Sequence, residues 1–180
     1  AIPQQLLDCH SSVTLTADVM FVNTIPFLVS SSRNINLTTI EHVPQRTAAK
    51  LGSLLQRIIN VYARAGFTVR TILMDNEFKK VKDHLPHVTL NTTAAAEHVG
   101  DIEGRIRVIK ERCRGIICTL PYRRLPQVML IHLLHHVVMW LNNFPVVHGI
   151  SRCFSPREII LRHKLDYKHH CRAPFGAYCE

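Results

Sequence analysis

Long hydrophobic runs are scarce in this sequence. The most apolar stretch, residues 128–141, is interrupted by three histidines and is shorter than the roughly 20 residues that a membrane-spanning helix needs. We therefore expect a buried helix there and no membrane partner. The first residues also lack a basic segment followed by an apolar one, so a secretory signal peptide is not expected.

Paired cysteines and glycine-rich loops are missing as well. The six cysteines are irregularly spaced and form no Cys-x-x-Cys pair, which argues against a disulfide scaffold and favours a reduced, intracellular protein. Cys9 and His10 alone cannot make a tetrahedral zinc site. The seven glycines form no phosphate-binding loop.

The charge of the chain is strongly positive. Its 180 residues carry a formal net charge of +9 and a pI of about 9.6, while the hydrophobic fraction is 47%. This composition is typical of one globular domain. The positive charge favours a polyanionic partner, with nucleic acid first and an acidic membrane second.

The hydrophobic pattern predicts an α/β fold. Strands are expected at residues 13–22, 27–31, 35–43, 68–74 and 88–90, and helices at 48–62, 101–118 and 126–143, with a short one beginning at Ser155-Pro156. Residues 91–100 are expected to form a loop. The first three strands read as an antiparallel meander, and the helix before residue 68 implies a parallel neighbour.

Three acidic residues lie at unusual positions. Asp18 lies within an apolar strand, Asp75 directly follows another, and Glu103 is expected in the first turn of an amphipathic helix. A carboxylate in an apolar strand is costly unless it is paired or binds a metal. If the two strands are neighbours, the carboxylates repel one another unless a hard cation such as Mg²⁺ or Mn²⁺ lies between them.

Each acid also has an ordinary explanation. Asp18 could face solvent at a strand end, and Asp75 could begin a turn. Glu103 could pair with Arg107 along its helix, which is worth about 0.3–0.5 kcal/mol. The order of the three acids along the predicted elements is what favours a shared site.

Four stretches of the sequence resemble the catalytic core of copia-type (Pseudoviridae-like) retrotransposon integrases. They are TADVMFVNTIPFLVSSSRN around Asp18, TVRTILMDNEF around Asp75, EHVGDIEGRIRVIKERCR around Glu103, and LPYRRLPQVMLIHLLHHVVMWLNNFPVVHGISRCFSPREII towards the end. Together the resemblance runs from about residue 12 to residue 178. It implies a ribonuclease-H-like fold, with a five-stranded mixed sheet of three antiparallel strands and parallel additions, flanked by helices.

The resemblance also implies a set of functional residues. Asp18, Asp75 and Glu103 would form the catalytic triad of the DDE superfamily and hold two Mg²⁺ or Mn²⁺ ions. Glu97 and Glu111 are the alternatives to Glu103. Glu103 is preferred because Glu97 is expected in a loop and Glu111 lies deeper along the helix.

Basic residues after Glu103 are the predicted DNA contacts. Helical spacing places Arg107 and Lys110 on the same face as Glu103, and the resemblance implies that this face meets DNA. Arg105 and Arg114 are assigned to nucleic-acid binding with them. The alternative is that these residues form a basic stripe on the helix that faces solvent and makes salt pairs, without binding DNA.

Histidines give two weaker metal candidates. His132, His135 and His136 share a helix, but the helix is apolar almost all round, so core or helix-contact histidines are expected. His169, His170 and Cys171 are a weak candidate for the same reason.

The expected function is that of an integrase that processes 3′ ends of retrotransposon cDNA and joins them to chromosomal DNA. The protein is expected to be a homo-oligomer, part of a larger polyprotein, in the nucleus and in cytoplasmic particles. Residues 1–11 would be a leader, 12–165 the catalytic core and 166–180 a tail. Related nucleases or transposases are the alternatives among enzymes. A decayed or repurposed DNA-binding or oligomerisation module is the non-catalytic alternative, because Gly104 stands where the family commonly has a basic residue.

Overall fold

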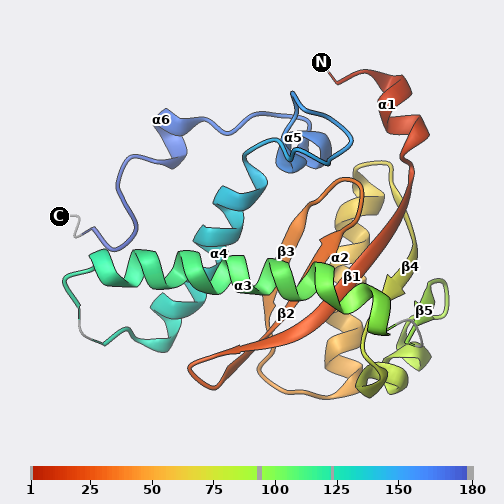
Figure 1. Ribbon diagram of the computed structural model, residues 1–180, viewed down its shortest axis with the longest axis horizontal. Helices are drawn as coiled ribbons and strands as arrows, with labels where there is room; N and C mark the ends of the chain where they lie inside the picture. The colour runs from red at the N-terminus through yellow and green to blue at the C-terminus, as the bar shows by residue number, and fades with distance from the viewer. Residues whose placement is uncertain (1, 93–94, 123, 178–180) are drawn as a thin grey trace.

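A five-stranded mixed sheet is the centre of the molecule (Figure 1). The computed structural model describes residues 2–92, 95–122 and 124–177, and of residues 77 and 95–99 only the backbone. The strand order is β3-β2-β1-β4-β5. The strands are β1 (Ser12–Val22), β2 (Ile25–Ser32), β3 (Thr38–His42), β4 (Thr68–Leu73) and β5 (Thr89–Asn91). The first three are antiparallel, and β4 and β5 are added in parallel, so the predicted sheet is confirmed.

Helices cover both faces of the sheet. They are α1 (Gln4–Cys9), α2 (Ala48–Arg64), the 3-10 helix η1 (Asn76–His84), α3 (Ala95–Thr119), α4 (Gln127–Asn142), α5 (Pro156–Leu161) and α6 (Tyr167–His170). The long helix α3 crosses one face and contacts β1 and β2, while α4 packs on β3 and on α3 (Figure 1). On the opposite face α2 contacts β4 and η1.

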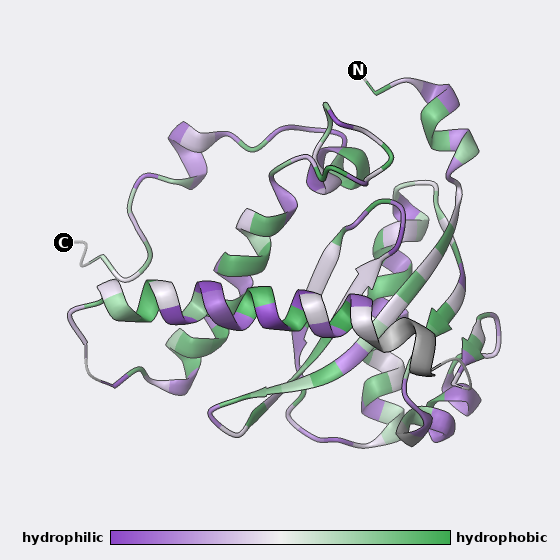
Figure 2. Cartoon of the chain, in the orientation of Figure 1, coloured by the Kyte–Doolittle hydropathy of each residue, from purple (hydrophilic) through white to green (hydrophobic). Residues whose placement is uncertain are grey.

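Two hydrophobic cores separate these layers. Alternation along β1 sends Leu15 and Ala17 to the α2 side and Met20 to the α3 side. The α3 side also holds Phe27 and Ile109, both fully buried. Figure 2 shows apolar colour over most of α4, whereas α3 alternates between polar and apolar residues because one of its faces is open to solvent.

Start and stop signals in the sequence act as predicted. Gly66 follows α2 with φ +85°, a left-handed conformation that glycine adopts without strain. Ser155 caps α5 through a reciprocal capping box with Glu158, and Pro156 occupies the first turn. The predicted helix at 126–143 is confirmed as α4.

The prediction of a loop over residues 91–100 is wrong from residue 95 onward. Helix α3 already begins at Ala95, so Asp101 is not its N-cap and Glu103 is not in its first turn. A run of alanines precedes Glu97, and alanine has the highest helix propensity. That propensity outweighs the single glycine at position 100, which had indicated a loop.

The histidines of α4 do not lie as one group. His132 and His135 are exposed, so neither is a core histidine. His136 makes the expected helix contacts, accepting a 3.0 Å hydrogen bond from Trp140 Nε1 and packing on Phe175. The described part of the predicted tail therefore returns to α4, while the domain boundary at residue 165 stays a prediction.

A side-chain amide fastens α4 to the edge strand β3. Asn142 accepts a hydrogen bond from the backbone N–H of Thr38 at 2.9 Å and donates one to its carbonyl at 2.7 Å. The amide thus replaces a neighbouring strand for one residue of β3. The two residues are 104 positions apart in the sequence, so this contact contributes to tertiary rather than local structure.

We expect Asn142→Ala to lower the free energy of unfolding by about 1–3 kcal/mol, because it leaves the backbone of the buried Thr38 without partners. Urea denaturation measures the loss. Asn143→Ala is the control, since its amide bonds only to Met139 within the same helix. Equal effects of the two substitutions would contradict a specific role for Asn142.

Two further observations bear on the protein class. Within the described ranges, no helix is both long and apolar enough to span a lipid bilayer. Five cysteines, Cys9, Cys113, Cys118, Cys153 and Cys171, are free thiols. Burial raises the pKa of the Cys113 thiol to about 11, so this group stays protonated at neutral pH.

Candidate active site and nucleic-acid interface

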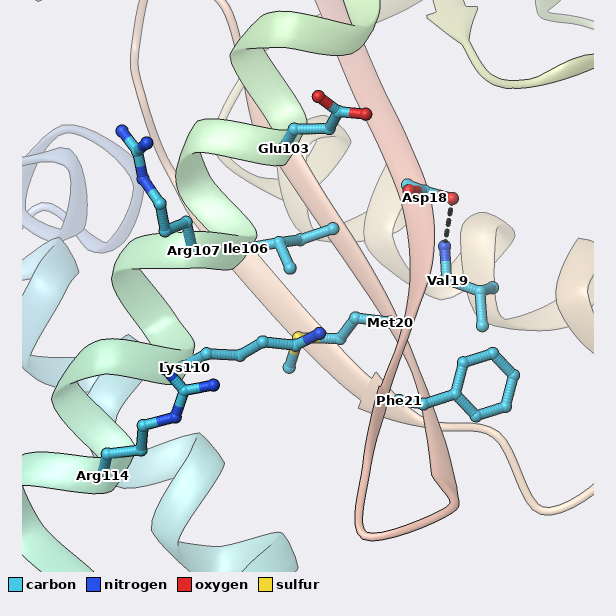
Figure 3. A pocket seen from close by; sticks show the side chains of 9 residues that line it. All are labelled: Asp18, Val19, Met20, Phe21, Glu103, Ile106, Arg107, Lys110 and Arg114. Carbon is cyan, nitrogen blue, oxygen red and sulfur yellow. Dashed lines mark hydrogen bonds between the residues drawn. The ribbon is translucent and has the colours of Figure 1, made fainter.

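A cavity of about 390 Å³ lies between the second half of β1 and helix α3. Its charged lining consists of Asp18 from the strand and Glu103, Arg107, Lys110 and Arg114 from the helix, with apolar groups between them. Two carboxylates and three cations from distant parts of the sequence therefore face one space. Figure 3 shows this arrangement at close range.

Asp18 is held by the strand that carries it. Asp18 is two residues before Met20 in β1, so strand alternation directs both side chains to the α3 side of the sheet. Its Oδ1 accepts a hydrogen bond of 2.7 Å from the backbone N–H of Val19 (Figure 3). The side chain is partly buried, which limits solvation of its charge.

Asp75 follows strand β4, beyond the last residue pair that joins β1 and β4. That parallel pairing ends at Thr16 and Leu73; Asp18 lies two residues further along β1, and Asp75 lies two residues past the end of β4. An irregularity earlier in this ladder sets the alternation so that Ile72 and Met74 face the α2 core. Asp75 therefore belongs to the same side of the sheet as Asp18.

The structure nevertheless leaves Asp75 outside the lining of the cavity. Its Oδ1 accepts a hydrogen bond from the N–H of Asn76 and caps η1, and the residue is exposed. The ordinary role considered for Asp75, that of beginning a turn, thus occurs in the structure. Its carboxylate is therefore used at the start of η1 and not at the cavity.

Glu103 reaches the cavity from one face of α3. Arg107, Lys110 and Arg114 follow at intervals of four, three and four residues, which keeps all four on one side of a helix. In Figure 3, Glu103 and Lys110 extend towards β1, while Arg107 is directed away from the strand. Lys110 and Arg114 also line an adjoining cavity of about 230 Å³ near the turn after β1. The cationic surface thus continues away from the carboxylates.

Arg105 does not belong to this group. It lies on the other side of α3, where its guanidinium donates a hydrogen bond of 3.4 Å to Asn36 Oδ1. Burial lowers the pKa of Arg105 because it disfavours the charged form. The predicted basic residues are therefore divided between two sides of the helix. Arg105 is surrounded by residues such as Arg33 and His148, and no motif in the sequence indicates that these residues lie together.

The competing glutamates take different places. Glu111 is exposed and is not among the residues that line the cavity. The side chain of Glu97 is outside the described residues, and its backbone lies in α3 rather than in a loop. Glu103 is thus the α3 acid that the structure brings to the same cavity as Asp18.

Metal-binding chemistry is present in part. Carboxylate oxygens, which Asp18 and Glu103 supply, are ligands that Mg²⁺ and Mn²⁺ prefer. Among the residues that the structure describes, however, no three His, Cys, Asp or Glu side chains are grouped so that they could hold a metal ion. The two carboxylates at the cavity fit a hard cation in kind, whereas Asp75 is not among the lining residues.

Comparison with solved structures identifies the fold. A crystal structure of the catalytic core domain of BIV integrase matches with a TM-score of 0.60 and 18% sequence identity, covering 83% of this chain and 93% of that one. The fold is therefore the ribonuclease-H-like fold of an integrase catalytic core, as predicted. No protein-family model matches the chain, and no curated protein does.

Proposed function

We propose that this protein is the catalytic core of a copia-type retrotransposon integrase, a polynucleotidyl transferase that processes cDNA 3′ ends and joins them to chromosomal DNA. One observation carries the proposal: Asp18 and Glu103 face a single cavity together with Arg107, Lys110 and Arg114. The fold supports it, because a solved structure with the same fold is an integrase catalytic core.

The reaction that we assign is a transfer at phosphorus. The oxygen of water, or of a DNA 3′-hydroxyl, forms a new bond to the phosphorus of a phosphodiester. The bond from phosphorus to the leaving 3′-oxygen breaks, and that oxygen takes up a proton. No covalent bond to the protein is needed for this transfer.

Two Mg²⁺ or Mn²⁺ ions would be held by Asp18, Glu103 and Asp75. Such ions, when bound, activate the attacking oxygen and neutralise charge on the phosphoryl group. Asp18 and Glu103 already share the cavity. Asp75 would complete the set by exchanging its hydrogen bond to Asn76 for the cation.

The cations of α3 would hold the DNA. Lys110 extends towards β1 (Figure 3), where it can bind a phosphate beside the reacting one. Arg107 and Arg114 extend the phosphate contacts along the helix. Such contacts position duplex DNA without reading its sequence. A homo-oligomer and a nuclear location, with passage through cytoplasmic particles, belong to the same proposal.

A second candidate is a DNA-binding or oligomerisation module without catalytic activity. The position of Asp75 favours it, because its carboxylate caps η1 and does not line the cavity with the other two acids. This candidate keeps the fold and the basic surface but needs no metal.

Asp75→Asn separates the two candidates. We expect wild-type protein to join 3′ ends of short duplexes to a second duplex in Mg²⁺ or Mn²⁺, and the variant to lose this by a factor on the order of a hundred or more. Products are measured on sequencing gels, with EDTA as a blank. Asp83→Asn, an exposed aspartate in the same 3-10 helix, is the matched control and should stay active.

Two results would overturn the catalytic proposal. One is metal-dependent joining that survives Asp75→Asn undiminished. The other is a folded wild-type protein that binds DNA but joins nothing in either metal, which is the outcome that the second candidate predicts.

A further inference from the structure

A second recess lies on the opposite side of α3 from the carboxylates. Its volume is about 430 Å³. Thr16 and Ser31 come from β1 and β2, Arg33 and Asn36 from the connection between β2 and β3, Arg105 from α3, and His148 from the connection after α4. Five parts of the chain thus supply hydroxyl, amide, imidazole and guanidinium groups to one space, which Asp101 of α3 also lines with its carboxylate.

The charges in this recess do not cancel. Arg33 pairs with Asp101 at 3.6 Å, and the two side chains are 38% and 68% exposed, so solvent screens the pair. Arg105 is partly buried, and in the described part of the chain it forms no salt bridge. Its one side-chain hydrogen bond among these residues, to the neutral Asn36, is long at 3.4 Å. A partly buried guanidinium with so little compensation favours an anion.

Two glycines lie on the surface of α3 between the two cavities. On a helical projection, Gly100 and Gly104 lie between the side that carries Glu103 and the side that carries Arg105. A Cβ added at either glycine would meet no atom within 4 Å. These glycines therefore weaken the helix without any close packing in the chain in return. A bare helix surface of this kind lets another backbone approach closely.

We propose that the recess of Arg33, Arg105 and His148 binds a backbone phosphate of duplex DNA, so that α3 lies between two phosphate-binding surfaces. Arginine suits this role because its planar fork donates two hydrogen bonds to one phosphate. The proposal rests on the proposed function for its partner, DNA, but not on metal ions or chemistry. It assigns Arg105 to a different phosphate from those bound by Lys110 and Arg107.

The salt dependence of DNA binding tests the assignment. Fluorescence anisotropy with a labelled duplex, in EDTA, gives the slope of log K against log salt for the whole chain. We expect Arg105→Gln to lower the magnitude of this slope by about 0.9, the value of one phosphate contact on duplex DNA. Affinity should fall about tenfold, as for one charged hydrogen-bonded contact. Arg33→Gln should also lower the slope and the affinity. Because the Arg33 side chain is 38% exposed, this substitution should not disturb the fold.

The matched control and an opposite change sharpen the test. Arg64→Gln, an exposed arginine of α2 on the other face of the sheet, should leave the slope unchanged. Asp101→Asn removes the negative charge beside Arg33 and should tighten DNA binding roughly two- to fivefold, the range of one exposed ion pair. A purely structural role for Arg105 predicts no gain in Asp101→Asn.

Three outcomes would overturn the assignment. Slopes for Arg105→Gln and Arg33→Gln equal to that of Arg64→Gln would exclude a phosphate contact, as would unchanged binding in Asp101→Asn. Inorganic phosphate, compared with chloride at equal ionic strength, provides the third arm. Phosphate could raise the melting temperature of the wild type but not that of Arg105→Gln, while the salt-dependence slopes of DNA binding are the same for every variant. In that case the recess binds free phosphate and not DNA. None of these readouts requires strand transfer, so failure here and failure of the catalytic proposal are distinguishable.

Discussion

Glu103→Gln is expected to lower the rate of Mg²⁺- or Mn²⁺-dependent strand transfer by a factor on the order of a thousand or more. The substitution keeps the size of the side chain but removes its negative charge and one oxygen donor. If Glu103 helps to hold a divalent cation at the reacting phosphate, its loss removes several kcal/mol of transition-state stabilisation, which corresponds to this factor. Glu103 is exposed, so the fold should be retained.

DNA binding separates the loss of chemistry from a loss of substrate. In EDTA, Glu103→Gln should bind a duplex at least as tightly as the wild type, because it removes a negative charge from a cavity that holds Lys110 and Arg107. Single-turnover strand transfer, started by adding Mg²⁺ or Mn²⁺ to this complex, then measures the chemical step.

Glu111→Gln is the matched control, since it makes the same chemical change on the same helix at an exposed position outside the cavity. It should stay within a few-fold of wild-type activity. If Glu111→Gln is the inactive variant and Glu103→Gln is active, the assignment of the third acid is wrong. Glu97→Gln tests the remaining alternative in the same assay.

The arrangement of the sheet could be predicted because it depends on short-range patterns. The alternation in β1 and the short turn after it indicated an antiparallel neighbour, and the long helix before β4 required a parallel one. Both features can be recognised from residues that are close together in the sequence. The pairing of Asp18 with Glu103 in one cavity depended instead on the resemblance, because no local pattern fixes where α3 crosses β1.

Arg105 illustrates what charge alone could not predict. It was grouped with Arg107 and Lys110 because all are basic, yet two helical residues rotate a side chain by about 200° around the axis. Arg105 therefore faces Asn36 and Arg33, which are far away in the sequence and carry no motif. Helical spacing was enough to separate Arg105 from Glu103 but was not applied to it, whereas the recess itself required the tertiary structure.

The start of α3 and the carboxylate of Asp75 were mispredicted or left open for different reasons. At Ala95 two local preferences competed, and alanine propensity outweighed the glycine signal. Asp75 satisfies two local roles at once, since a residue that follows a strand can cap a helix and can also belong to a metal site. The structure shows the capping role. Only a measurement with metal present decides the other.

Ile109 is one of the buried residues through which α3 packs on the sheet. It is fully buried between the helix and the sheet, in the core that also holds Met20, Phe27 and Leu134. Glu103 and Lys110 are carried by the same helix, on the side that faces the cavity. The contacts of Ile109 therefore help to fix the position of α3 relative to β1, and with it the positions of Glu103 and Lys110 in the cavity.

Ile109→Ala is expected to lower the free energy of unfolding by about 2–5 kcal/mol, because it removes apolar contacts and leaves a cavity that the surrounding core fills only in part. Urea denaturation with an unchanged m-value measures this loss. Ile109→Val should cost only about 0.5–1.5 kcal/mol, and Val128→Ala, at a side chain 64% exposed, should change stability by less than about 0.5 kcal/mol. A loss in Ile109→Ala as small as that of Val128→Ala would mean that α3 does not rest on the sheet through this residue, and the cavity that unites Asp18 with Glu103 would lose its structural basis.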